Sequence, residues 1–378
     1  MKNLNNKKIL IATGGTGGHI NPALAVAGYI REHFPQSKIL FVGTAVKMEA
    51  QLVPNAGFDF TTIDIQGISR DISLSGLKTN IKTVTKLLKS ESKAKKIIND
   101  FKPDVVLGFG GYVSGPVLRM ACKMGIPCAI HEQNAFPGMT NKSLAKKVEC
   151  VMLTYKDAEK YIKPKNPCVI TGLPVRGEMV RADREISRAE LKLGDKPLIL
   201  SMGGSLGSKV INEAVTELIA QRYEKKNCYF LHATGKNGIG MFDVIKDEKG
   251  IDLEKNPHIM LREYINDMDR CMSAADLLIC RAGASTLSEI EALGKPSILV
   301  PYPYAAENHQ YFNAMSLVNK GAAILIEDKD LTAERLISEI DKLLENPDKL
   351  REMGENARKG AILDATQRIA ECVADICK

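Results

Sequence analysis

Short apolar runs of four to six residues recur along the chain, and several of them end in a glycine-containing turn. Their residues are mainly Ile, Leu and Val without regular polar alternation, which is typical of strands buried on both faces of a parallel sheet. Stretches with helical periodicity lie between them. The pattern therefore predicts an α/β protein. The runs that predict strands are residues 8–12, 38–43, 103–107, 126–130, 148–153, 168–171, 197–201, 276–280 and 297–300.

The first run leads into a glycine-rich turn, residues 13–19 (TGGTGGH). A helix is expected from Pro22 to His33, because proline suits the first turn of a helix. Strand, glycine loop and helix N-terminus form a layout whose backbone N–H groups bind phosphate. Position 20 is Ile where G-x-G-x-x-G needs its third glycine, and the Walker pattern is absent. The turn therefore disfavours a nicotinamide dehydrogenase and a P-loop enzyme.

Residues 276–313 form a second strand–turn–helix–strand unit. Thr286 and Glu289 have the T-x-x-E spacing of a capping box, which would start a helix at Thr286, and Gly294 would end that helix. Ligands bind at the carboxyl edge of such sheets. Glu289 therefore either caps its own helix or contacts a ligand.

A third turn, residues 108–116 (GFGGYVSGP), follows another predicted strand, and the next strand ends in residues 131–134 (HEQN). A polar cluster at the end of a buried strand lies at the ligand-binding edge of the sheet. Two interpretations stay open for His131 and Glu132. They either contact a ligand or form a buried pair whose polar atoms satisfy one another.

The second half of the chain restarts the first. KILIATGGTGG from Lys8 parallels PLILSMGGSLG from Pro197, and residues 104–134 resemble residues 276–308 in element order. Two copies of one plan predict two Rossmann-like, doubly wound parallel-sheet domains that face a central cleft. We expect an N-terminal domain over 1–174, a second domain over 175–346, and a helical segment over 347–378 that packs back on the first.

Composition adds limits to this picture. The 378 residues are 44% hydrophobic and 26% charged, as in ordinary globular proteins, and no apolar run approaches the roughly 18 residues of a membrane span. The nine cysteines include no C-x-x-C pair. This fits reduced thiols in the cytosol and neither a disulfide framework nor a zinc site.

The net charge of +7 equals the surplus of the first hundred residues, which hold 14 Lys and Arg against 7 Asp and Glu. Residues 77–99 predict a helix with an apolar stripe and a lysine face. That face is either simply solvated or attaches to an anionic membrane, where each lysine adds about 1 kcal/mol. Aromatic residues do not interleave with the lysines, which disfavours nucleic acid. The membrane candidates are Leu74, Leu77, Lys78, Ile81, Lys82, Lys86 and Lys89.

Eight motifs lie in both halves of the chain, namely GGTGGH (14–19), GFGGYVSGP (108–116), HEQNAFPG (131–138), GLPVR (172–176), GGSLG (203–207), EYINDM (263–268), RAGASTLSE (281–289) and ENHQYFNA (307–314). Together they resemble the MurG family, the membrane-associated transferases of peptidoglycan synthesis with the GT-B architecture. The resemblance implies inverting transfer of GlcNAc from UDP-GlcNAc to the MurNAc C4 hydroxyl of undecaprenyl-pyrophosphoryl-MurNAc-pentapeptide. This reaction converts lipid I into lipid II, and no cofactor is expected.

The same resemblance implies which residues bind the donor. Where some members have two glutamines, this chain has His309 before Gln310, so the sugar contact is expected through Gln310. Tyr112 and Ser114 would line the acceptor side. The implied donor contacts are Thr16, Gly17, Gly18, Asn134, Arg176, Ser205, Ile265, Ala284, Ser285, Thr286, Leu287, Ser288, Glu289 and Gln310.

The reaction needs a base for the acceptor hydroxyl. His19 is the first candidate, since histidine exchanges protons near neutral pH, and Glu132 is the alternative. His19 would otherwise bind a backbone group or the acceptor diphosphate. Asp267 and Asp269 have the D-x-D spacing of a metal site, but carboxylates in the first turn of a helix explain them better, and no metal is expected.

The expected partners are UDP-GlcNAc, the lipid I acceptor, the anionic inner-membrane surface and other cell-wall synthesis proteins. The expected location is peripheral, on the cytoplasmic face of the cell membrane. Two other functions stay open. A UDP-GlcNAc 2-epimerase shares a similar two-domain shape, and a non-catalytic nucleotide-sugar-binding subunit would need no base.

Overall fold

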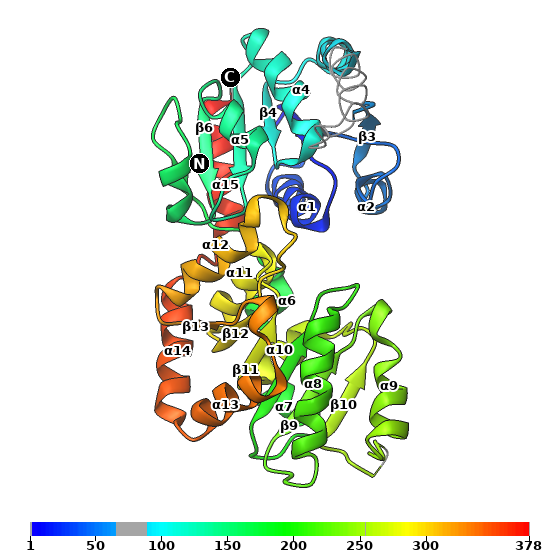
Figure 1. Ribbon diagram of the computed structural model, residues 1–378. Coiled ribbons are helices and arrows are strands. Elements are labelled where there is room, and N and C mark those ends of the chain that lie inside the picture. Colours follow the sequence, from blue (N-terminus) through cyan, green and yellow to red (C-terminus); the bar gives the residue numbers. More distant parts are fainter. Residues whose placement is uncertain (1, 66–88, 254, 378) are drawn as a thin grey trace. The chain divides into compact units, whose positions relative to one another are not determined.

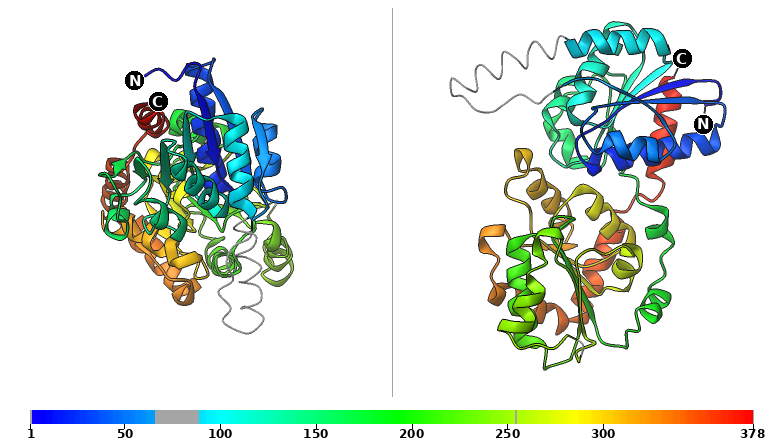
Figure 2. Two further views of the ribbon diagram at one scale, coloured as in Figure 1. Left: turned by 90° about the horizontal axis from the view of Figure 1, so that it is seen from above. Right: turned by 90° about the vertical axis from the view of Figure 1, so that its right-hand side faces the viewer.

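The computed structural model describes residues 2–65, 89–253 and 255–377. The chain forms two compact units, one of residues 1–174 with 364–378 and one of residues 175–363. Both chain ends lie in the first unit (Figures 1 and 2). The expectation that all of 347–378 packs on the first domain is wrong in part, because α14 (Pro347–Lys359) packs against α11 and α13 of the second unit.

The first unit contains a seven-stranded sheet of order β3-β2-β1-β4-β5-β6-β7, and all neighbouring strands are parallel. Strands β4 and β5 each begin two residues later than predicted, because Pro103 and Pro127 cannot donate to the ladder and precede the paired residues. Strand β5 also ends later than predicted, so that His131 and Glu132 belong to it. The strands are β1 (Lys8–Ala12), β2 (Lys38–Gly43), β3 (Asp59–Thr62), β4 (Val105–Gly108), β5 (Cys128–Glu132), β6 (Cys150–Leu153) and β7 (Val169–Ile170).

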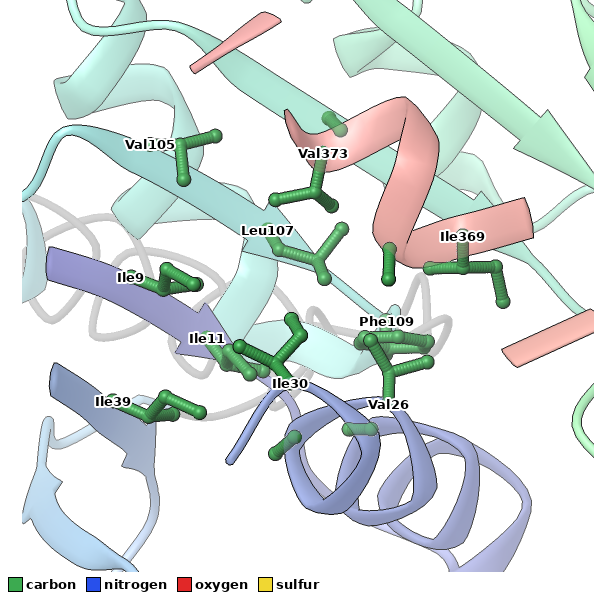
Figure 3. Packing of buried hydrophobic residues seen from close by; sticks show 14 of the residues in the cluster. Ile9, Ile11, Val26, Ile30, Ile39, Val105, Leu107, Phe109, Ile369 and Val373 are labelled. Atoms are coloured by element: carbon green, nitrogen blue, oxygen red, sulfur yellow. The ribbon is translucent and has the colours of Figure 1, made fainter. Parts of the chain in front are cut away.

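Helices cover this sheet, and α15 joins it from the far end of the sequence. Helix α15 packs beside α1 and against β4 and β6. Figure 3 shows Ile369 and Val373 of α15 with Val26 and Ile30 of α1 around the apolar residues of β1 and β4. The helices are α1 (Gly17–His33), α2 (Glu49–Asn55), α4 (Gly111–Lys123), α5 (Met139–Leu144) and α15 (Ala365–Ile376), and residues 89–101 are also helical.

The second unit contains a six-stranded parallel sheet of order β10-β9-β8-β11-β12-β13. Its strands are β8 (Leu198–Met202), β9 (Tyr229–Ala233), β10 (Ile259–Arg262), β11 (Leu277–Cys280), β12 (Ser297–Leu299) and β13 (Ala323–Leu325). Its helices are α6 (Gly177–Arg181), α7 (Arg184–Glu190), α8 (Lys209–Arg222), α9 (Met241–Asp243), α10 (Met268–Ala274), α11 (Ala284–Leu293), α12 (His309–Val318), α13 (Ala333–Leu344) and α14.

Each sheet reverses its strand order at one place, between β1 and β4 in the first unit and between β8 and β11 in the second. The loops after these strands diverge, and ligands bind at such switch points. The predicted glycine turns follow these four strands. The expected pair of doubly wound parallel-sheet domains is therefore confirmed. Across the described residues, every helix is too short or too polar to cross a bilayer.

Candidate functional site

The glycine loop after β1 differs in one respect from the expectation. Helix α1 begins at Gly17, five residues before Pro22, so that His19 lies in the first turn of the helix. Thr16 is the N-cap residue, and its side chain makes no capping hydrogen bond. Thr16 and Gly18 are exposed, while Gly17 and His19 are half-buried. The first turn thus begins at exposed backbone, and a helix N-terminus favours an anion.

A buried carboxylate that the sequence did not single out holds this loop. Glu49 of α2 is fully buried, and its Oε2 accepts a hydrogen bond from Gly15 N at 3.0 Å. Its Oε1 accepts from Thr44 N at 3.0 Å and Thr44 Oγ1 at 2.7 Å. A Cβ added to Gly14 would stand 2.6 Å from Glu49 Oε1, so glycine is required there. Glu49 therefore fixes the position of the glycine loop from the protein interior.

His19 contacts a network of side chains at the carboxyl end of β5. Its Nδ1 lies 3.0 Å from Gln133 Oε1. The Gln133 Nε2 lies 3.1 Å from Phe109 O and 3.1 Å from His131 Nδ1, and His131 Nε2 lies 2.8 Å from Gly172 O. Burial lowers the pKa of His131 to about 4, so that its ring is neutral at pH 7. His131 is thus a buried structural residue.

Glu132 is also occupied by its own surroundings. Its Oε1 accepts from Asn134 N at 3.0 Å and from Asn134 Nδ2 at 3.3 Å. Its Oε2 accepts from Gly138 N at 3.1 Å and from Asn141 Nδ2 at 2.8 Å. The side chain is 2% exposed. A carboxylate that accepts four internal hydrogen bonds stabilises the 133–141 loop, and this favours His19 over Glu132 as the base. Asn134 is half-buried beside it.

The two acceptor-side candidates lie in different environments. Tyr112, at the start of α4, is 64% exposed. Ser114 is fully buried, with its hydroxyl 3.0 Å from Ala12 O and 2.7 Å from Gly110 O. The expectation that Ser114 lines the acceptor side is wrong for this structure, because the side chain has no access to a ligand. Its hydroxyl instead links the start of α4 to the end of β1.

In the second unit, the loop after β8 carries Ser205, which is exposed. Helix α8 follows it with Ser208 as N-cap, whose Oγ accepts from Ile211 N at 3.4 Å. Arg281, directly after β11, donates to Ser208 Oγ at 2.6 Å and forms an ion pair with Asp328. Arg281 thus joins the two loops at the switch point of this sheet.

The predicted capping box does not form. Helix α11 begins at Ala284, two residues before Thr286, with Gly283 as N-cap and no side-chain cap. Glu289 instead accepts from Arg176 Nε at 3.0 Å and Nη2 at 2.9 Å, both on Oε1. Burial raises the pKa of Glu289, and the Arg176 guanidinium partly offsets this. The two residues are 113 positions apart, so the sequence pattern alone did not reveal their pairing.

The remaining donor candidates fall into accessible and buried groups. Gln310 Oε1 accepts from Tyr302 N at 2.9 Å, which leaves the amide nitrogen as the donor end. His309 Nδ1 donates to Ala306 O at 2.7 Å. Ile265 is 2% exposed, so only its backbone suits ligand contact. Ala284, Ser285 and Thr286 are half-buried, and Leu287 and Ser288 are buried.

Most of the membrane candidates lie outside the described residues, namely Leu74, Leu77, Lys78, Ile81, Lys82 and Lys86. Lys89 is described, exposed and helical. For the D-x-D pair, Asp267 Oδ1 accepts from Arg262 Nη1 at 2.7 Å at the start of α10. Among the residues with described positions, no three His, Cys, Asp or Glu side chains are grouped as metal ligands.

Comparison with known proteins adds independent information. Residues 9–153 match the glycosyltransferase family 28 N-terminal domain, and residues 198–369 match the glycosyltransferase family 28 C-terminal domain. The chain is 46% identical over 372 residues to a UDP-N-acetylglucosamine–N-acetylmuramyl-(pentapeptide) pyrophosphoryl-undecaprenol N-acetylglucosamine transferase of Acetivibrio thermocellus, covering 98% of each chain. A protein of the same name from Desulforamulus reducens is 44% identical, again covering 98% of each.

Among solved structures, Acinetobacter baumannii MurG has a TM-score of 0.79 and 30% identity, with 98% of this chain and 99% of that chain covered. A UDP-GlcNAc 2-epimerase from Neisseria meningitidis, bound to UDP-GlcNAc, has a TM-score of 0.60 and 18% identity, with 97% of this chain and 100% of that chain covered. At that identity the second likeness concerns the fold alone.

Proposed function

The chain belongs to glycosyltransferase family 28 and, within it, to the MurG family, and from this premise we propose that it converts lipid I into lipid II. The proposed reaction transfers GlcNAc from UDP-GlcNAc to the MurNAc C4 hydroxyl of undecaprenyl-pyrophosphoryl-MurNAc-pentapeptide. The observation that carries the proposal is the 46% identity over 98% of a named transferase. The epimerase likeness extends to the fold only, so it favours no second function.

The second unit would bind the donor. Amide groups at the start of α11 and in the loop after β8 suit the diphosphate, since a helix N-terminus favours negative charge. A carboxylate can accept from both hydroxyls of a ribose diol, which is the role we assign to Glu289. Arg176 forms its ion pair with Oε1 of Glu289. Ribose binding would therefore use Oε2 or move Arg176 aside.

The sugar of the donor would be held through Gln310. Its amide nitrogen is the donor end, because its oxygen already accepts from Tyr302 N. Ser205 is exposed in the loop after β8, where it suits a phosphate oxygen. Ala284 to Thr286 form the first turn of α11. Together these groups would stabilise UDP as it leaves with the negative charge that develops on its phosphate.

The first unit would supply the base. His19 lies half-buried in the first turn of α1, and the competing carboxylate of Glu132 accepts four internal hydrogen bonds. Removal of the hydroxyl proton by His19 lets the acceptor oxygen attack C1 of GlcNAc directly as UDP leaves. One displacement inverts the anomeric centre, without a covalent sugar–enzyme intermediate. Tyr112 would contact the acceptor, since it is exposed at the start of α4.

The acceptor is a lipid, so the enzyme would act peripherally at the cytoplasmic face of the cell membrane. The surplus of positive charge in the first hundred residues suits an anionic lipid surface. Lys89, Lys93 and Lys95 are exposed on the described part of the lysine-rich helix. Binding to vesicles with and without anionic lipid would test this part of the proposal separately.

The proposal is tested by incubating the full chain with labelled UDP-GlcNAc and a soluble lipid I analogue in the presence of EDTA. Labelled disaccharide product is the expected result. Release of ManNAc without disaccharide would indicate an epimerase and overturn the proposal. Tight binding of UDP-GlcNAc without turnover would indicate a binding subunit.

A further inference from the structure

The buried residues behind His19 fix the positions of protons that the sequence leaves open. His131 Nε2 lies 2.8 Å from the carbonyl oxygen of Gly172. A carbonyl only accepts, so Nε2 carries the proton of this ring. His131 is fully buried and neutral, because burial lowers its pKa to about 4. Its Nδ1 is consequently a hydrogen-bond acceptor.

The amide of Gln133 must then point its nitrogen toward His131. Gln133 Nε2 lies 3.1 Å from each of three acceptors, which are His131 Nδ1, His131 O and Phe109 O. The reversed amide would place oxygen against these lone pairs, a repulsive arrangement inside the protein. Gln133 is 2% exposed, so water cannot relieve it. The amide oxygen is therefore the atom that faces His19.

The contact between Gln133 and His19 is the last hydrogen bond in the series that begins at Gly172 and runs through His131. Gln133 Oε1 lies 3.0 Å from His19 Nδ1 and can only accept, which places the proton of neutral His19 on Nδ1. The backbone allows this approach at Gly110, where φ is +87° and an added Cβ would stand 3.1 Å from His19 Cε1 and Nδ1. A side chain at position 110 would push the ring away from Gln133.

We propose that Gln133 is a positioning residue that holds neutral His19 in the Nδ1–H tautomer, so that Nε2 is the nitrogen that accepts the acceptor's proton. The catalytic part of this inference rests on the proposed transfer function. In that reaction, the acceptor O–H proton goes to His19 Nε2 while the oxygen bonds to C1 of GlcNAc. The C1–phosphate oxygen bond breaks, and its electron pair leaves with UDP. Gln133 itself exchanges no proton and keeps the imidazolium oriented through Nδ1–H.

The first test is spectroscopic and needs no substrate. The full chain, with its six histidines labelled with ¹⁵N, is examined by long-range ¹H–¹⁵N correlation at a pH where His19 is neutral. The His19→Gln variant assigns the His19 signals by their loss. A protonated Nδ1 and an unprotonated Nε2 are expected. The opposite tautomer, or an even mixture, would overturn the inference whatever reaction the protein catalyses.

The second test compares variants in the transfer assay. Gln133→Leu removes the acceptor, and kcat should fall about 10- to 100-fold while the KM for UDP-GlcNAc is unchanged. Gln133→Glu keeps an oxygen acceptor near His19 Nδ1, so it should retain the Nδ1–H tautomer and a higher kcat than Gln133→Leu. Gln36→Leu makes the same change at an exposed glutamine and serves as the control.

The outcomes separate the two proposals. Gln133 does not position His19 if the Gln133→Leu variant still shows His19 in the Nδ1–H tautomer. The same conclusion follows if the kcat of Gln133→Leu equals that of Gln36→Leu. If Gln133→Leu does not fold, the wild-type spectrum and Gln133→Glu still decide the matter. A wild-type chain that shows the expected tautomer but transfers no GlcNAc would refute the proposed function and leave the tautomer assignment standing.

Discussion

Acidification should destabilise the first unit through His131, and the lowered pKa of this residue sets the size of the loss in unfolding free energy. Burial lowers the pKa of His131 to about 4, whereas an unfolded chain titrates near 6.5. Between these pH values the unfolded state binds the proton and the folded state does not. The contribution of His131 to stability is therefore complete above pH 6.5 and is lost as pH falls toward 4. The free energy of unfolding falls by about 2 kcal/mol at pH 5 and by about 3 kcal/mol once the pH is below both pKa values.

The second unit contains a matched residue. His232 of β9 is fully buried between Ser201 Oγ at 2.7 Å and Asn212 Oδ1 at 3.2 Å, and burial lowers its pKa to about 4 as well. Each unit therefore contains a buried histidine whose pKa is lowered to about 4. An assay that follows each unit separately can distinguish their contributions.

Hydrogen exchange measured by mass spectrometry supplies that assay, with peptides from β4–β5 and from β8–β9 as reporters. Exchange is followed between pH 7.5 and 5, with correction for the intrinsic pH dependence of amide exchange. His131→Gln can still donate to Gly172 O but cannot titrate. It should be less stable than the parent at pH 7.5 and should lose much less stability on acidification, in the first unit only.

His33→Gln is the control, because His33 is exposed on α1. This variant should keep the full pH dependence of the parent chain. The reasoning would be refuted if His131→Gln lost as much stability between pH 7.5 and 5 as the parent did. It would also fail if the change appeared in the β8–β9 peptides.

Three further predictions concern other parts of the two units. Glu289→Gln should weaken UDP-GlcNAc binding about 10-fold or more, since a charge-assisted hydrogen bond contributes about 1.5–3 kcal/mol; titration calorimetry measures this, with exposed Glu213→Gln as control. Glu49→Gln should cost about 1–3 kcal/mol in urea unfolding, because an amide N–H would face backbone N–H donors; an unchanged midpoint would contradict the anchoring role. Arg188→Met removes hydrogen bonds to Ala274 O and Lys196 O, while Asp276 keeps its ion pair with Arg184; it should destabilise the second unit by about 1–3 kcal/mol, seen as faster exchange in β8 but not β1.

Nine of the thirteen described strands were predicted, because their signal is local, whereas β3, β9, β10 and β13 were not predicted. An apolar run bounded by glycine or proline needs no partner to be recognised, and β1 and β2 occupy the predicted residues. The strand order was less accessible, although the internal repeat indicated two similar sheets. The prediction for His131 and Glu132 depended on where β5 ends. Because β5 extends through Glu132, both side chains are buried at the carboxyl end of the strand, where Glu132 hydrogen-bonds the loop that follows it.

The contacts of the site were not predictable from spacing, because they join residues far apart in sequence. Gln133 and His19 are separated by 114 positions, and Gly15 and Glu49 by 34. The switch point brings the loop after β1 beside the loop after β4, and β5 follows next in the sheet. That order places Gln133 behind His19. The motif HEQN contained the relevant residue, yet its function depends on this neighbour.

The helix starts show why a search for capping side chains fails near the site. Helices α7, α13 and α14 have side-chain caps, from Asp183, Thr332 and Asn346. Helices α1, α4 and α11, which follow β1, β4 and β11, begin without a side-chain cap, whereas α8, which follows the fourth of these central strands, is capped by Ser208. A capping side chain would occupy the first-turn N–H groups that an anion needs. At α1 and α11 the capping signal is therefore absent, and the sequence placed these two helices too late for the same physical reason that suits their first turns to a diphosphate.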